Sequence, residues 1–189
     1  MQGIVPTVEL LARLNDKDQV LEYAEWVLEK NPDQAVRIFA ERSKETADLI
    51  DATTVLGLLE KLGDAVIQTY LQFLIHKRAN TSEEYHTKLA MAYTDQALAI
   101  KPGLESAEAM VVRKRLQDFL VSPICKTSFA KLLPKIQGTV MIAELILLYR
   151  GMGQHDKALD VRRTTARFRR QLFDHTSLTL RADNLNVVS

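Results

Sequence analysis

The sequence has 189 residues and a mass of 21.4 kDa, a length typical of one ordinary domain or one stretch of a repeat array. With 47% hydrophobic and 26% charged residues it can bury a substantial core, which excludes collagen-like, low-complexity and wholly disordered chains. Its 25 Lys and Arg against 24 Asp and Glu leave no overall field to attract nucleic acid or an anionic membrane. The 7 glycines and 5 prolines are few, which favours long helices over turn-rich strands.

The charges are unevenly distributed along the chain. Residues 1–60 carry a net charge of −6, residues 61–149 of +3 and residues 150–189 of +4. The two ends would attract each other in a head-to-tail contact, either between copies in a homodimer or with an adjoining solenoid. Salt would weaken such a contact. The alternative is that the asymmetry reflects only where the sequence begins and ends.

Cysteine content and hydropathy favour the cytoplasm. A single cysteine, Cys125, cannot form an internal disulfide, which fits a reducing compartment. No run approaches the roughly 20 apolar residues of a membrane span, because Glu144 and Arg150 interrupt the longest one. Residues 1–6 lack the basic and apolar regions of a signal peptide.

Apolar residues recur at spacings of three and four along almost every segment, a pattern typical of amphipathic helices. The pair Asn31-Pro32 divides a helix near 18–30 from one near 32–42, since a capping side chain precedes a proline suited to the first helical position. Asp51 is expected to cap a helix that runs to Leu62 and closes at Gly63.

The same pattern continues through the second half of the chain. Thr81 and Glu84 fit a capping box for a helix that reaches Ile100. Further helices are expected at about 104–121, 126–136, 139–151 and 155–173. The tail from 176 to 189 matches neither a helix pair nor a zinc-binding RING.

About ten helices joined by short turns are typical of stacked antiparallel helix pairs. Similar turns recur at 28–35, 98–103 and 151–159, but not at the 34-residue period of tetratricopeptide repeats. The sequence therefore predicts an all-α fold, an irregular α-solenoid of stacked antiparallel helix pairs. We expect the solenoid segment over residues 1–160, followed by a basic helix and C-terminal tail over 161–189.

Four phrases along the chain resemble, in their order, the middle portion of the clathrin-heavy-chain-repeat subunits of the HOPS and CORVET membrane-tethering complexes. The resemblance is to the branch that contains the vacuolar sorting proteins that recognise Rab GTPases and the TGF-β receptor-associated protein. It covers roughly residues 20–160. Each phrase alone is a helix-packing pattern, and their order carries the likeness. The phrases are Ala24-Glu25-Trp26-Val27-Leu28 with residues 33–39, Thr69-Tyr70-Leu71 with residues 84–93, residues 115–120, and residues 144–159.

The resemblance implies a protein-protein interaction scaffold rather than an enzyme. It would be a solenoid segment of a tethering subunit, with other subunits as partners and a location peripheral to endosomal or lysosomal/vacuolar membranes. In this family, Rab binding is associated with an N-terminal propeller that the present sequence does not contain. The alternative that the resemblance leaves open is a signalling adaptor that binds TGF-β-type receptors or their effectors. A helical enzyme with an unrecognised site is the least favoured alternative.

Five arginines cluster on the last predicted helix. Helical geometry places Arg163, Arg167 and Arg170 on one face, with Arg162 and Arg169 on another. They form a candidate protein-binding strip for an acidic partner. The alternative is a solvated helix end, where positive charge is favoured by the helix dipole. Lipid and nucleic acid are weaker candidates, and nucleic acid is disfavoured because few aromatic side chains that could stack on bases interleave with the arginines.

Catalytic, cofactor and metal sites are not predicted. His76, His86, His155 and His175 never pair at helical spacing, and we expect them to have packing or capping roles. Cys125 has no identifiable base and is expected to be an inert thiol. The Gly151-x-Gly153 pair lacks the strand and third glycine of a dinucleotide site.

Aromatic residues on the helical stripes are expected to pack in the core, with one or two left as anchors for a partner. They are Tyr23, Trp26, Phe39, Tyr70, Phe73, Tyr85, Tyr93, Phe119 and Tyr149.

Overall fold

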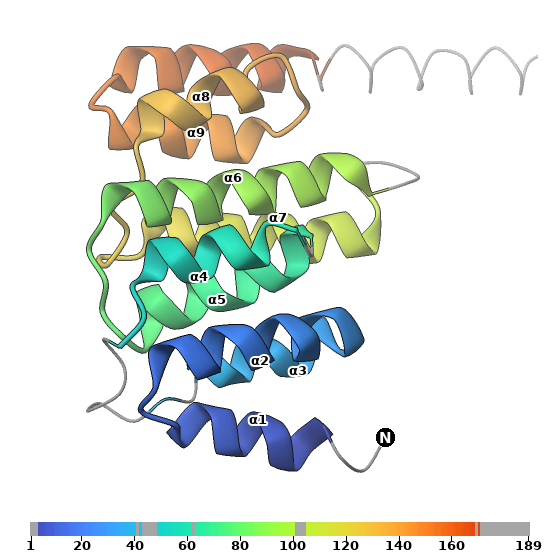
Figure 1. Ribbon diagram of the computed structural model, residues 1–189. Helices are drawn as coiled ribbons and strands as arrows, with labels where there is room; N and C mark the ends of the chain where they lie inside the picture. The colour runs from blue at the N-terminus through green and yellow to red at the C-terminus, as the bar shows by residue number, and fades with distance from the viewer. Residues whose placement is uncertain are drawn as a thin grey trace, which may run out of the picture. The chain divides into compact units, whose positions relative to one another are not determined.

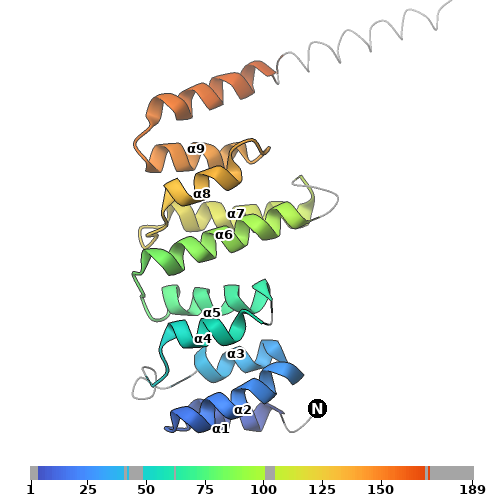
Figure 2. The ribbon, with the colours of Figure 1, turned by 45° about the horizontal axis from the view of Figure 1, so that its top comes forward.

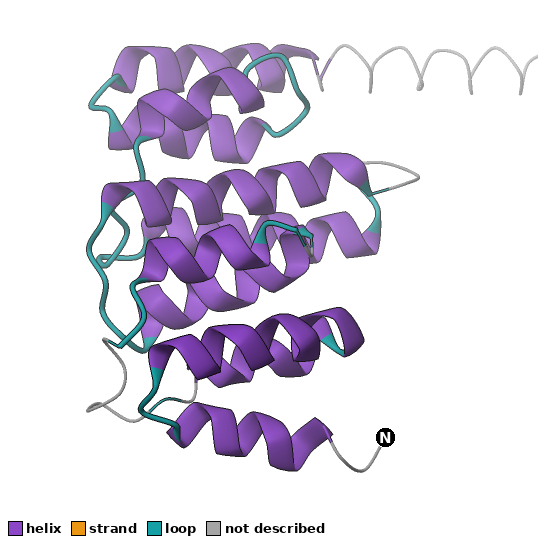
Figure 3. Cartoon of the chain, viewed as in Figure 1, coloured by secondary structure: helices purple, strands orange, loops and turns teal. Residues whose placement is uncertain are grey.

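A computed structural model describes residues 4–40, 42, 49–61, 63–100, 105–168 and 170. Within these residues all regular structure is helical and no strand occurs (Figure 3). The chain forms two compact units, residues 1–92 and residues 93–189. The predicted all-α fold is confirmed, and the packing of successive helices is that of an α-solenoid.

Unit 1 is organised around its third helix. The helices are α1 (Ile4–Arg13), α2 (Lys17–Lys30), α3 (Pro32–Ala40), α4 (Ala52–Leu59), α5 (Asp64–His76) and most of α6 (Glu83–Ala99). Helix α3 contacts α1, α2 and α5, while α4 packs on α5 (Figure 1). Their apolar stripes meet in a core, where Val8, Ile38, Leu59, Leu71 and Leu89 are almost completely buried.

Local signals in the sequence set several helix starts. The side chains of Asp16 and Asp51 cap α2 and α4, accepting hydrogen bonds from the backbone N–H groups of Gln19 at 3.1 Å and Thr54 at 2.8 Å. The predicted division at Asn31 between α2 and α3 is also confirmed.

Helix α4 is shorter than predicted. It ends at Leu59 rather than at Leu62, and its last part loosens into a turn at residues 60–61. Gly63 nevertheless has the expected special backbone conformation, with a φ of 104°, and it directly precedes α5.

A buried guanidinium closes the C-terminal end of α1. Arg42 is only 7% exposed, and it donates hydrogen bonds to the carbonyl oxygens of Leu11 at 3.2 Å and Leu14 at 2.5 Å. These carbonyls lie at a helix end, where intrahelical donors are missing and the dipole favours a cation. Arg42 therefore ties the chain after α3 back to α1.

Unit 2 contains the end of α6, then α7 (Ala107–Val121), α8 (Phe129–Ile136), α9 (Ile142–Gly151) and a helix over 155–168. Helix α9 contacts both α7 and α8 (Figure 2). The ring of Tyr93 on α6 meets that of Phe119 on α7 edge-on, with centroids 6.4 Å apart. At the end of α9, Gly151 packs so close to Phe129 that a Cβ would overlap the ring.

The helices predicted in this half are confirmed, with later starts. Those expected from about 104, 126 and 139 begin at Ala107, Phe129 and Ile142. The helix expected over 155–173 is described over 155–168. The predicted division between residues 160 and 161 falls within that helix and stays a prediction, and residues 171–189 lie outside the described part of the chain.

Candidate protein-binding groove

A groove lies in unit 2 along α9 and the helix over 155–168, and it extends over part of α7. It consists of two cavities of about 810 Å³ and 430 Å³, which both include Ile146 and Arg162 in their walls and therefore adjoin. The α7 side of the larger cavity is formed by Met110, Arg113 and Gln117. We refer to the combined cavities as the unit 2 groove.

Helical spacing in the sequence produces the two long walls of this groove. On α9, Ile142, Ile146 and Arg150 follow one another at intervals of four residues and share a face. On the following helix, the wall residues recur at intervals of three or four, again along a single face. They are His155, Leu159, Arg162 and Ala166.

A buried ion pair supports the larger cavity. Arg113 on α7 donates two hydrogen bonds to Glu144 on α9, from Nε to Oε1 at 2.8 Å and from an Nη to Oε2 at 2.9 Å. Gln117 donates a third, at 2.8 Å, to Oε1. The Glu144 side chain is completely buried, whereas that of Arg113 is 11% exposed at the groove. The network therefore fixes α7 against α9 and positions one cation of the wall.

Opposing effects act on the pKa of Glu144. Burial acts to raise it, but the hydrogen bonds from Arg113 and Gln117 outweigh burial and hold the pKa below its ordinary value. The carboxylate is consequently ionised at neutral pH, and its charge is matched by Arg113. The sequence did not predict the pairing of Glu144 with Arg113. Its one signal was a lone carboxylate in the apolar run of residues 141–149.

The structure describes four of the five arginines of the predicted cluster. Arg162 points into the unit 2 groove, whereas Arg163 lies 3.9 Å from Asp160 in a solvent-exposed ion pair. Arg167 and Arg170 are also exposed, and Arg169 lies outside the described residues. Arg162 and Arg163 thus lie on different faces, as helical spacing predicts, because adjacent positions on a helix point about 100° apart. The assignment of these arginines to protein binding stays a prediction.

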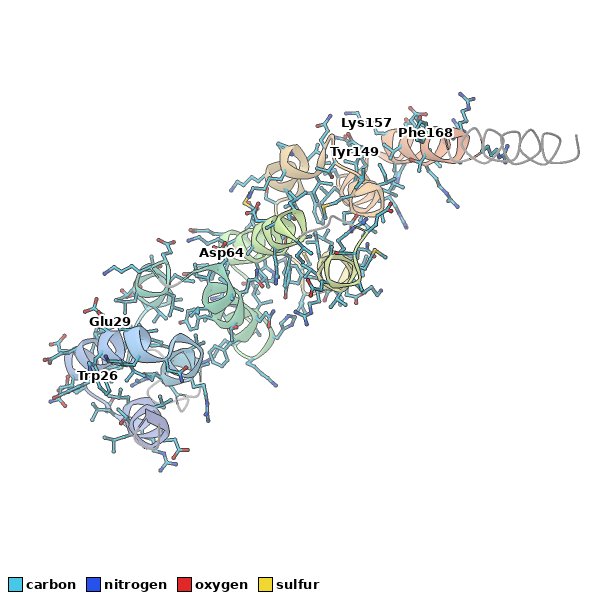
Figure 4. All side chains as sticks on the ribbon, turned by 90° about the vertical axis from the view of Figure 1, so that its right-hand side faces the viewer. Trp26, Glu29, Asp64, Tyr149, Lys157 and Phe168 are labelled. Atoms are coloured by element: carbon cyan, nitrogen blue, oxygen red, sulfur yellow. The ribbon has the colours of Figure 1, made fainter. Side chains whose placement is uncertain are left out.

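On the helix over 155–168, Ala158 is buried, and the neighbouring Lys157 reaches α9. The Lys157 ammonium lies over the Tyr149 ring, 5.8 Å from its centroid (Figure 4). Thr165 donates a hydrogen bond to the carbonyl of Val161 at 2.8 Å within the helix. Ala158 and Thr165 both belong to the lining of the unit 2 groove.

The other singled-out polar residues have mainly structural surroundings. His86 is buried, and its Nε2 lies 2.8 Å from the carbonyl oxygen of Asn80. Cys125 is partly exposed, and its thiol lies within hydrogen-bonding distance of the Thr127 hydroxyl at 3.1 Å. His155 is exposed in the groove wall. His175 lies outside the described residues.

Two aromatic residues lie outside the core, which fits the expectation that one or two would be left as anchors for a partner. Tyr23 and Trp26 on α2 are 52% and 51% exposed, and they line a shallow pocket in unit 1 with Thr7 and Glu22 (Figure 4). The α2 face that packs inward consists of Val20, Ala24, Val27 and Leu28, which leaves the aromatic positions on the opposite side. The expectation is confirmed for Phe39, Tyr70, Tyr93, Phe119 and Tyr149, which are buried.

No group of three or more potential metal ligands occurs among the described residues. Every helix in the described ranges is too short or too polar to span a lipid bilayer.

The chain is similar to segments of much longer proteins. It is 29% identical over 159 residues to human transforming growth factor-beta receptor-associated protein 1 and 30% identical over 163 residues to the Danio rerio homolog, in each case across 82% of this chain. It is also 25% identical to vacuolar sorting protein 3 of Arabidopsis thaliana, across 77% of this chain. For the Caenorhabditis elegans homolog of vacuolar protein sorting-associated protein 39, the identity is 26% across 84% of this chain.

The chain is therefore similar to segments of both receptor-associated and vacuolar sorting proteins. The family resemblance predicted from the sequence is thereby confirmed, while the relation to clathrin-heavy-chain repeats stays a prediction. The chain spans only 17–19% of the length of these relatives. No family model matches it, and neither does any solved structure.

Proposed function

We propose that this chain is a non-enzymatic scaffold, a solenoid segment of a subunit of an endosomal or vacuolar membrane-tethering complex of the HOPS/CORVET type. The observation that carries the proposal is its similarity to vacuolar sorting proteins 3 and 39 across more than three quarters of its length. An all-α solenoid suits this role, because stacked helices hold distant binding surfaces at fixed separations.

Other subunits of the same complex are the proposed partners. Contact with a Rab GTPase would be indirect, through regions of the family that this chain does not contain. The peripheral location at endosomal or vacuolar membranes would follow from membership of the complex. The signalling-adaptor alternative is less favoured, because only the receptor-associated relatives support it, whereas the vacuolar sorting relatives support the tethering role across the same chain.

The absence of enzyme activity is part of the proposal. It is supported by the structural engagement of two groups that could serve chemistry. The Glu144 carboxylate is fully occupied by Arg113 and Gln117. The His86 ring is buried against the Asn80 carbonyl.

Affinity purification of the tagged chain from cells of its native source tests the function. We expect vacuolar sorting subunits among the co-purified proteins identified by mass spectrometry, and co-localisation with an endosomal or vacuolar marker. Recovery of receptors or their effectors without any sorting subunit would overturn the tethering role and favour an adaptor.

A further inference from the structure

The unit 2 groove is elongated and partly apolar. Its two cavities join end to end along α9 and the helix over 155–168, so the groove is elongated rather than round. Its lining includes Met110, Val140 and Leu159, which are 52%, 61% and 47% exposed. Exposed apolar side chains that gather in one groove are typical of surfaces that bind a partner.

The charges at this groove are mainly positive. Arg150 and Arg162 line it from its two long walls, and Arg113 lies beside them with its charge matched by Glu144. Glu105 is the one acidic residue that the described lining exposes, and it lies at the α7 end.

Acidic residues of the helix over 155–168 do not offset this charge. By helical spacing, Asp156 and Asp160 share a face with Arg163 and Arg167, away from the groove. The ion pair of Asp160 agrees, because its partner is Arg163 on that face. The groove-facing cations are therefore available to an acidic ligand, whereas those on the other face have carboxylates beside them.

We propose that the unit 2 groove binds an acidic amphipathic helix of a partner protein. Apolar residues of that helix at i, i+3/i+4 and i+7 would pack between the two walls against Ile142, Ile146 and Leu159, and flanking carboxylates would reach Arg150 and Arg162. This inference rests on the proposed function and names the chemistry of its partner. A lipid headgroup is less favoured, because the described lining is largely apolar and, beside Arg113 with its Glu144 partner, offers two arginines, Arg150 and Arg162.

Adjacent arginines provide a matched pair of variants. Arg162→Glu reverses a charge that lines the groove, and Arg163→Glu makes the same change one position along, on the other face. Both side chains are exposed, so neither change is expected to unfold the chain. Circular dichroism melting curves for both variants check that they remain folded.

Site-specific photo-crosslinking identifies the occupant. A photoreactive amino acid replaces Leu159 in the full chain, expressed in cells of its native source, and the crosslinked peptide is sequenced by mass spectrometry. We expect an acidic amphipathic segment of another protein. Adding Arg162→Glu should reduce the crosslink about tenfold, since a charge reversal at the contact replaces attraction by repulsion, and adding Arg163→Glu should leave it nearly unchanged.

Four results would overturn the proposal: crosslinks to lipid, crosslinks to another copy of this chain, crosslinks to a basic segment, or no crosslink. Equal losses with Arg162→Glu and Arg163→Glu would do so as well. The failure is distinguishable from a failure of the proposed function. If sorting subunits co-purify with the Arg162→Glu variant as well as with the unmodified chain, the proposed binding through the groove is wrong and the tethering role stands. If they do not co-purify with the unmodified chain, the tethering role itself is wrong.

Discussion

Arg113 and Glu144 form a two-bonded ion pair that joins α7 to α9, at distances of 2.8 and 2.9 Å. The pair connects the fold of unit 2 to its groove, because the carboxylate is completely buried while the guanidinium reaches the groove wall. The pair specifies how α7 is oriented against α9, since a guanidinium and a carboxylate match only in one relative orientation of the two helices.

Removing one partner of this pair should strongly destabilise the chain. Arg113→Ala leaves the buried Glu144 carboxylate without its counter-charge, and we expect a loss of about 3 kcal/mol in the free energy of unfolding, measured by urea titration. The double variant Arg113→Met with Glu144→Leu should recover much of that loss, because no buried charge remains. A loss for Arg113→Ala below about 0.5 kcal/mol, the range of ordinary surface substitutions, would contradict the buried network.

Acid should selectively weaken the same contact. The pKa of Glu144 is lower in the folded than in the unfolded chain, so the ionised carboxylate contributes its full stabilisation above the ordinary pKa of 4.5. That contribution declines as the pH falls from there toward the folded pKa, and it is lost below it. Urea titrations at pH 7, 4 and 3 should show a steeper decline for the native chain than for Glu144→Gln, which lacks this titration. Parallel declines would contradict the assignment.

The single tryptophan should be nearly dispensable for folding. Because Trp26 is about half exposed, Trp26→Ala is expected to cost roughly 1 kcal/mol, whereas Leu71→Ala, at a fully buried position, should cost about 2–5 kcal/mol. Acrylamide should also quench the fluorescence of Trp26 in the native state. Core-like protection from quenching would mean that α2 packs through the opposite face.

The guanidinium that closes α1 should be sensitive to conservative replacement. Arg42→Ala removes two charged hydrogen bonds, to Leu11 and Leu14, and roughly 3 kcal/mol of stability is expected to be lost. The stability of Arg42→Lys should lie between those of the native chain and Arg42→Ala, since an ammonium lacks the planar fork that reaches both carbonyls. Because Trp26 lies in the same unit, its fluorescence during urea unfolding measures both variants. Equal stability of the lysine variant and the native chain would contradict the paired geometry.

The sequence predicted features that depend on neighbours along the chain. The Asp51 cap and the break at Asn31 were found because a capping side chain acts on a backbone group three residues away. The Glu144 pair was not found, since Arg113 lies 31 residues away and helical pattern carries no information on which charges meet. Likewise, the periodicity of α2 does not reveal whether its aromatic side packs inward, and the structure places Trp26 outside.

For the candidate site, the sequence located the basic helix but not its orientation. Positions 162 and 163 are both arginine, so the sequence does not indicate which of them lines the groove. In the structure it is Arg162. The apolar wall was equally hidden, because Leu159 and Ile146 fit the pattern of ordinary core residues.

The most direct test of a tethering scaffold that binds through one groove compares three forms of the chain in a single experiment. The native chain, Arg162→Glu and Arg163→Glu are purified in parallel from cells, and vacuolar sorting subunits are quantified by mass spectrometry. The account predicts equal recovery with the native chain and Arg163→Glu, and about tenfold lower recovery with Arg162→Glu. Failure of the native chain to recover any sorting subunit, or equal recovery with both variants, would contradict it.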